Sequence, residues 1–202
     1  MGLRQAILMN ITVKIHGSRN FICRPDTTWE RESRDFYSPE FVSELFYTPV
    51  VFARISKAGK CIGRKFAGRY YDAVGYGALL YVEDMLDGTP ESIACASCAD
   101  HTSILPFPMY DRITLESGEN VFAMVKDGIT IYSTSEGSAD MIEDAISKAS
   151  ATISLRTGDI IAIELAPAGR LASRGQEGTE TNDTEINGSF CGNELFRFKI
   201  RM

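Results

Sequence analysis

The sequence predicts a single α+β domain that is mainly β. Most of its apolar segments are short and rich in β-branched or aromatic residues, which is typical of strands, whereas only two segments carry apolar residues at helical spacing. The 202 residues are 44% hydrophobic and 24% charged, so the chain is long enough to build one complete hydrophobic core. Such a core needs no metal or disulfide to be stable, and we expect one domain over residues 1–202.

The N-terminal half alternates expected strands with a long loop. Residues 26–46 are polar, aromatic and charged, which indicates a surface loop. Pro25 ends the strand before this loop, and Pro49 is expected to confine the start of the next strand to an edge or a bulge. The strands expected in this half are residues 7–15, 21–23, 47–55 and 76–82.

Two short helices are expected. The first covers residues 65–74, where apolar residues recur at helical spacing, and Gly75 follows at a position suited to a helix end. The second begins at Ser138, whose hydroxyl can cap free amides, with Asp140 favourably placed in the first turn. The buried face of this second helix is expected to consist of Met141, Ile142, Ala145, Ile146 and Ala149.

The C-terminal half is expected to be mostly strands and loops. Residues 88–108 read as a second long connection because they contain three prolines, and residues 170–182 as a polar loop. Lys126-Asp127-Gly128 indicates a hairpin, since glycine accepts positive φ freely. The expected strands are residues 113–115, 121–125, 129–132, 160–165 and 195–200.

Charge and hydropathy exclude several classes of partner. The chain carries 21 basic and 27 acidic residues, a formal charge of −6, and the basic residues are scattered, so we expect no nucleic acid partner. No stretch approaches the roughly 18 apolar residues that a membrane span requires, and the first residues lack the apolar run of a signal peptide. We therefore expect a cytoplasmic protein without a membrane anchor, whose five cysteines are reduced thiols.

Cys95 and Cys98 have the spacing of a CxxC motif, and His101 follows shortly after. One such pair supplies half of a zinc site, and no fourth ligand is evident beside His101. Cys98 and His101 could also act as a nucleophile and its base, but the sequence identifies no third group to orient the imidazole. The interpretation we favour is that these are incidental thiols in a loop.

Carboxylates are the other source of chemistry. A Mg²⁺ or Mn²⁺ site needs several carboxylate oxygens that converge on one point, and Asp26, which follows a strand end, could contribute one. Glu30 and Glu32 are two further carboxylates, separated by a single residue. They lie among Arg31 and Arg34 in a polar segment, which is the usual pattern of a solvated surface.

Several segments carry a resemblance to a known family when they are read in order. They are FICRPDT at 21–27, KFAGRYYD at 65–72 with Gly75 and Gly77, GSADM at 137–141, LRTGDII at 155–161, PAG at 167–169 and EING at 185–188. This series resembles the fumarylacetoacetate hydrolase family, in the short form that includes acylpyruvate hydrolases, oxaloacetate decarboxylases and hydroxy-heptadienedioate isomerases. The resemblance implies a mixed rolled sheet with a few short helices, normally in a homodimer.

The family's chemistry uses a divalent ion that chelates a dioxo acid and stabilises the enolate formed during the reaction. The resemblance assigns this ion to an Asp in the Pro-Asp-Thr segment, both acids of a Tyr-Glu-x-Glu strand, and an Asp on the following strand. Here only Asp26 matches. Thr48 and Val50 replace the two glutamates, and Leu79 stands where the third strand ligand is expected.

Other residues that the family uses are also replaced. Ser97, ahead of Asp100, stands in place of a lysine, and Glu83 in place of an arginine. The lid segment that carries the family's His and Glu is shortened to about residues 10–20, where His16 cannot be assigned the same role.

We therefore expect a homologue that has lost the usual metal site, needs no cofactor, and binds a small organic acid or a partner such as an active paralogue. Asp26 would be the one retained ligand. The residues expected to line the former pocket are Thr48, Val50, Leu79, Ser97 and Asp100.

Two alternatives remain open. One is an active Mg²⁺- or Mn²⁺-dependent hydrolase, decarboxylase or isomerase of dioxo or related oxo acids with a rearranged site, or with Cys98 and His101 in catalysis. The other is a zinc-stabilised binding module built on Cys95 and Cys98.

Overall fold

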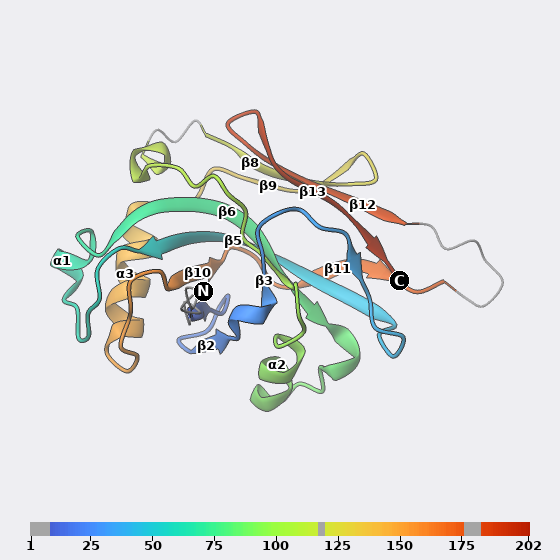
Figure 1. Cartoon of the computed structure of the whole chain (residues 1–202), viewed down its shortest axis with the longest axis horizontal. Coiled ribbons are helices and arrows are strands. Elements are labelled where there is room, and N and C mark those ends of the chain that lie inside the picture. The colour runs from blue at the N-terminus through green and yellow to red at the C-terminus, as the bar shows by residue number, and fades with distance from the viewer. Residues whose placement is uncertain (1–8, 117–119, 176–182) are drawn as a thin grey trace, which may run out of the picture.

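A computed structural model describes residues 9–116, 120–175 and 183–202 of the chain. Strands dominate it, as the sequence predicted, and they form two curved sheets that face each other (Figure 1). Within these residues no helix is long and apolar enough to cross a membrane. The expected mainly β fold class is confirmed.

The first sheet has eight strands and carries the longest ones. Its order is β2-β1-β10-β5-β6-β7-β3, and β11 pairs with the other end of β5. Its strands are β1 (Ile11–Lys14), β2 (Phe21–Arg24), β3 (Trp29–Glu30), β5 (Glu44–Ile55), β6 (Tyr71–Val82), β7 (Ser103–Ile104), β10 (Ile160–Glu164) and β11 (Gly169–Ser173).

The second sheet has five strands in the order β4-β13-β12-β8-β9. The expected hairpin joins β8 to β9, with Asp127 at φ 48° and Gly128 at φ 81°. Both residues have the positive φ that a two-residue hairpin turn of type I′ requires. The strands of the second sheet are β4 (Phe36–Tyr37), β8 (Phe122–Lys126), β9 (Ile129–Thr134), β12 (Thr184–Phe190) and β13 (Asn193–Arg201).

The expectation that Pro49 lies on an edge or a bulge is wrong, because β5 is an interior strand whose register shift with β6 falls at Arg54 and Ile55. The register partner of Pro49 in β6 is Ala78, and the Pro49 carbonyl oxygen accepts from the Leu165 amide (2.9 Å). On that side β10 ends at Glu164 and β11 starts at Gly169. The missing N–H of proline therefore falls at the break between β10 and β11, where no ladder hydrogen bond is lost.

The described residues include three α-helices, of which α3 (Ala139–Ser150) was predicted most closely. The Ser138 side chain accepts from the Met141 amide as its N-cap. The predicted helix over residues 65–74 shortens to α1 (Arg64–Ala67), because residues from Tyr71 onward pair with β5 instead. The third helix, α2 (Pro90–Ala96), lies inside the segment expected to be a loop.

Three other expectations for loops and strands are wrong. Residues 26–46 contain a 3₁₀ helix (Asp26–Thr28), β3, β4 and the start of β5 rather than one loop. The expected strand at 113–115 is part of a 3₁₀ helix (Arg112–Leu115) capped by Asp111. The expected polar loop begins with β11, and its residues 176–182 lie outside the described residues.

Two apolar clusters lie on opposite faces of the first sheet. The larger fills the space between the sheets, where the Tyr76 ring stacks on Phe122 at 4.9 Å between centroids and packs on Phe190 at 4.7 Å. The smaller, which we call the outer cluster, covers the opposite face, where Ala96 of α2 packs against it. Its buried members are Met9, Ile11, Val13, Val50, Phe52, Leu79, Tyr81, Ala96, Leu105, Ile160 and Ala162.

Gly77 is expected to be required for the pairing of β6 with β7. A Cβ atom there would lie 2.1 Å from the Ile104 carbonyl oxygen, which is backbone and cannot turn away. We expect Gly77→Ala to lower the free energy of unfolding by about 1–3 kcal/mol in urea denaturation. Gly63→Ala is the control, because its Cβ would meet only Phe66 at 3.7 Å; equal losses in both variants would contradict this reading.

Candidate functional site

Three of the predicted pocket residues share one face of the first sheet. Thr48 and Val50 are two residues apart on β5, and Leu79 of β6 is the register partner of Thr48. Side chains two apart on a strand point to the same face, so the register brings the three together. All three are completely buried. The Thr48 hydroxyl donates to the Ala166 carbonyl oxygen (2.7 Å) and is thereby occupied.

Val50 and Leu79 belong to the outer cluster, so this face presents methyl groups where the resemblance expects oxygen donors. Mg²⁺ and Mn²⁺ bind through several converging oxygen ligands. Within residues 9–116, 120–175 and 183–202, no group of three or more His, Cys, Asp or Glu side chains is arranged to hold a metal ion. The side chains on this face do not fit the divalent ion that the resemblance implies.

The remaining predicted residues lie elsewhere. Asp26 is exposed on the 3₁₀ helix Asp26–Thr28, and Asp100 is exposed on the turn after α2. These two turns contact each other, since the His101 amide donates to the Thr27 carbonyl oxygen (3.2 Å). Ser97 is buried at the end of α2, and its hydroxyl donates to the Ala94 carbonyl oxygen (2.8 Å). The two carboxylates therefore sit at the surface, outside the outer cluster.

A buried arginine occupies the outer-cluster side of the sheet. Arg24, at the end of β2, is 1% exposed. Its Nη2 donates to the Leu80 carbonyl oxygen (2.6 Å), and its Nη1 donates to the Thr102 carbonyl oxygen and to Ser103 Oγ (both 3.0 Å). The guanidinium carbon lies 4.6 Å from the centre of the Tyr81 ring, a cation–π distance.

Tyr81 connects this arginine to a carboxylate. Its hydroxyl donates to Glu164 Oε1 (2.5 Å), and the His16 amide donates to Glu164 Oε2 (2.8 Å). Burial raises the pKa of Tyr81 above its usual value, so the phenol keeps the proton that it donates. Burial likewise lowers the pKa of Arg24, opposed by Tyr81 and then Glu164. Arg24, Tyr81 and Glu164 form one connected unit, which we call the internal charge network.

The sequence analysis did not single out these three residues. A signal was present, because Glu164 is the only charged residue in the apolar strand 160–165 and Arg24 ends an otherwise uncharged one. A charge in a buried strand is rarely tolerated unless it is paired. Their convergence could not be read from sequence, because it depends on the packing of β2 against β6 and β10.

A hollow of about 840 Å³ lies on the far side of α2 from the outer cluster, and we call it the α2 pocket. Ala96 and Ile93 face the outer cluster, whereas Cys95 lines the pocket. The opposite wall comes from the segment that carries β4. The lining residues are Arg34, Asp35, Phe36, Tyr37, Pro39, Phe41, Met85, Cys95, Cys98, Ala99, Asp100 and His101.

The structure brings Cys95, Cys98 and His101 to this one pocket but does not join them chemically. All five cysteines of the chain are free, and the Cys98 thiol donates to the Ala94 carbonyl oxygen (3.1 Å). The described contacts contain no hydrogen bond between Cys98 and His101. A nucleophile–base pair needs that contact, so the geometry supports neither this pair nor a zinc site.

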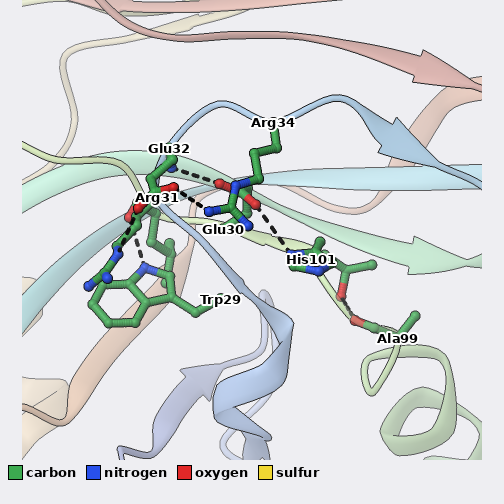
Figure 2. Close-up of polar contacts among 9 residues, drawn as sticks. Trp29, Glu30, Arg31, Glu32, Arg34, Ala99 and His101 are labelled. Atoms are coloured by element: carbon green, nitrogen blue, oxygen red, sulfur yellow. Dashed lines mark hydrogen bonds and ion pairs between the residues drawn. The ribbon is translucent and has the colours of Figure 1, made fainter. Parts of the chain in front are cut away.

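Glu30 is buried, which corrects the expectation of a solvated Glu30–Glu32 pair. Its side chain is 4% exposed, and its Oε1 accepts from the Glu32 amide (2.7 Å). Its Oε2 lies 3.2 Å from His101 Nδ1, as Figure 2 shows. Glu30 sits on β3, which pairs with β7, whereas Glu32 and Arg34 form an exposed ion pair. The buried carboxylate is the orienting group for His101 that the sequence could not identify.

Comparison with solved structures identifies the fold. Fumarylpyruvate hydrolase from Pseudomonas aeruginosa, solved with Mn²⁺ and pyruvate, superposes with a TM-score of 0.71 at 15% identity, covering 96% of each chain. Maleylpyruvate hydrolase from Sphingobium gives 0.74 at 13% identity, covering 96% of this chain and 70% of the other. A Yersinia pestis CO92 protein provisionally assigned to the fumarylacetoacetate hydrolase family gives 0.75 at 14% identity, covering 96% and 92%.

These similarities confirm the resemblance at the level of the fold. The chain has the fold of the fumarylacetoacetate hydrolase family. No family model and no curated protein matches its sequence. At such low identity the shared fold says nothing about which activity the chain has, so function must be argued from its own side chains.

Proposed function

We propose that the protein is a noncatalytic, ligand-binding relative of the fumarylacetoacetate hydrolase family, in which the internal charge network stands in place of a divalent ion. The observation that carries the proposal is the completely buried Arg24, which lies on the face where Thr48, Val50 and Leu79 replace the family's acids. In this arrangement the positive charge on this face is supplied by the Arg24 side chain instead of by a bound metal ion.

Electrostatics supports the absence of a metal. The guanidinium of Arg24 and the carboxylate of Glu164 balance each other through Tyr81, so the face needs no further cation. A divalent ion placed there would meet a like charge at low effective dielectric, where repulsion is stronger than in water. Val50 and Leu79 would offer it no oxygen in compensation for lost hydration. Asp26, the one retained family ligand, is exposed at the surface, and both oxygens of Glu164 are already engaged, by the Tyr81 hydroxyl and the His16 amide.

The proposal predicts that the purified protein binds neither Mg²⁺ nor Mn²⁺ specifically and does not cleave an acylpyruvate. Titration calorimetry should show no saturable site tighter than about 1 mM for either ion. Turnover with Mn²⁺ present should equal the uncatalysed rate. Asp26→Asn is the matched variant and should behave as the wild type does. Tight binding together with turnover, both lost in Asp26→Asn, would overturn the proposal.

A further inference from the structure

Cys95 and Cys98 lie one helical turn apart at the end of α2. The Cys98 amide donates to the Cys95 carbonyl oxygen (3.1 Å), so the helical turn continues past Ala96, the last residue of α2. By helix geometry, residues three apart in such a turn have Cα atoms about 5 Å apart. A disulfide requires a Cα separation of about 4.4–6.8 Å. The backbone therefore already holds the two cysteines at a separation that a disulfide can span.

The Cys98 thiol is directed toward the same turn. It donates to the Ala94 carbonyl oxygen (3.1 Å), four residues back along the chain. A helical side chain in this orientation lies over the residues three and four positions before it, and Cys95 is three positions before Cys98. Cys98 lies beyond the last residue of α2, so a small closing movement that brings the two Cβ atoms together leaves the helix itself intact.

Both thiols are accessible to a small reagent. Cys95 and Cys98 are exposed, and both line the α2 pocket, which gives a small molecule access to the pair. Cys23, Cys61 and Cys191 are exposed as well, but none of them has another cysteine near it in the sequence. Exposure alone does not distinguish the pair from the other thiols; the shared helical turn does.

We propose that Cys95 and Cys98 form a reversible dithiol–disulfide couple, which is oxidised by a low-molecular-weight disulfide such as oxidised glutathione. One cysteine thiolate attacks the glutathione disulfide, and one reduced glutathione leaves. The second thiolate attacks the resulting mixed disulfide at the protein sulfur, which closes the Cys95–Cys98 bond and releases the second glutathione. The two cysteines thereby lose two electrons and two protons, which the glutathione disulfide gains. Excess reduced glutathione reverses both steps.

This couple differs from the incidental loop thiols that the sequence favoured, because the structure places both cysteines on one turn at a helix end. Closing the bond removes the hydrogen that Cys98 donates to the Ala94 carbonyl oxygen and ties together two residues of the pocket wall. The couple is a modification site at the α2 pocket, and it does not depend on the ligand-binding function proposed above.

Redox titration of the full chain with glutathione tests the proposal. The protein is equilibrated with increasing oxidised glutathione at a constant concentration of reduced glutathione, quenched with acid, alkylated and digested with trypsin. No Lys or Arg lies between Arg69 and Arg112, so one tryptic peptide carries Cys95 and Cys98 and no other cysteine. In the wild type this peptide should lose two hydrogens, gain neither an alkyl group nor glutathione, and revert with dithiothreitol.

Cys95→Ser and Cys98→Ser separate ring closure from simple exposure. In each variant the remaining thiol should keep a glutathione adduct, because no second thiol displaces it. Half-modification of either variant should need at least about ten-fold more oxidised glutathione than half-oxidation of the wild type, since the closing step is intramolecular. Cys61→Ser is the matched control. It removes an exposed cysteine that precedes α1, and it should leave the titration of the pair unchanged.

Four results would overturn the proposal. In the first, the wild type accumulates two glutathione adducts on this peptide in place of the internal disulfide. In the second, the single variants titrate at the same concentration of oxidised glutathione as the wild type. In the third, the disulfide joins Cys95 or Cys98 to another cysteine of the chain or to a second chain. In the fourth, the internal disulfide forms only in urea, where the helical turn is lost.

Discussion

Replacing Arg24 by methionine is expected to lower the free energy of unfolding by about 3–5 kcal/mol, which is the range seen when one partner of a buried ionic network is removed. Methionine retains much of the length and apolar volume of the side chain. The variant loses the donors to Leu80 and Ser103, and Glu164, 8% exposed, becomes a buried carboxylate without a compensating charge. Urea denaturation of the purified variant measures the loss.

Two comparisons show how burial and charge each contribute to the stability loss in Arg24→Met. Arg54→Met removes an ion pair with Asp72 whose side chains are 40% and 47% exposed, and it should lower stability by less than about 1 kcal/mol. Glu164→Gln combined with Arg24→Met removes both charges, so the double variant should be more stable than Arg24→Met alone. A small effect of Arg24→Met, or no recovery in the double variant, would show that the network is not an electrostatic unit.

Val50→Glu is expected to be the most damaging attempt to restore a family acid. It places a carboxylate in the outer cluster, at a completely buried position whose register partner on β10 is Glu164. Burial and the like charge both favour the protonated form, so the pKa of the introduced carboxyl would be raised in the folded state. We expect a loss of at least about 3 kcal/mol at pH 7.

The sign of the pH dependence follows from linkage. A carboxyl whose folded pKa is raised destabilises the protein fully above that folded pKa. The part of the stability loss that is caused by the ionised carboxylate is regained as the pH falls toward the pKa of the carboxyl in the unfolded chain, about 4.3. Val50→Gln is the uncharged control, and its loss relative to wild type should stay constant over this range. Identical pH profiles for the two variants, or micromolar Mn²⁺ affinity in Val50→Glu, would mean that the face is less closed than the structure indicates.

Elements with strong local signals could be predicted from the sequence. The Ser138 cap and the apolar spacing define α3, and Asp127-Gly128 defines the β8–β9 hairpin. In both cases the signal and the structure involve the same few residues, and the local preference agrees with the fold. The missed α2 also had a local signal, since Thr89 caps the helix and Pro90 occupies its first turn.

Elements decided by distant pairing were harder to predict. The segment from Tyr71 to Val74 has helical spacing but extends β6, because it pairs with β5 on one side and Val74 pairs with Tyr110 on the other. The proline at position 49 is tolerated inside the sheet only because two other strands leave a gap beside it. The sequence near residues 71–74 and near Pro49 does not indicate which strands lie beside these positions.

The candidate site likewise has one part that could be predicted from the sequence and another that depends on contacts between distant residues. The resemblance indicated that Thr48, Val50 and Leu79 belong to one place, and the register brings them onto one face. The network that fills this face, and the burial of Glu30 beside His101, depend on residues from separate strands and turns. Residue types alone could not show that these charges are buried, because Glu30 lies in a segment as polar as a surface loop.

The central claim is that protein charges and methyl groups, rather than a metal ion, fill the face formed by β5 and β6. The most direct measurement is an anomalous difference map from a crystal soaked in Mn²⁺. Our account predicts no peak between Arg24, Val50 and Leu79, with the Arg24 guanidinium in density over the Tyr81 ring. A well-occupied, six-coordinate Mn²⁺ held there by protein carboxylates would contradict it.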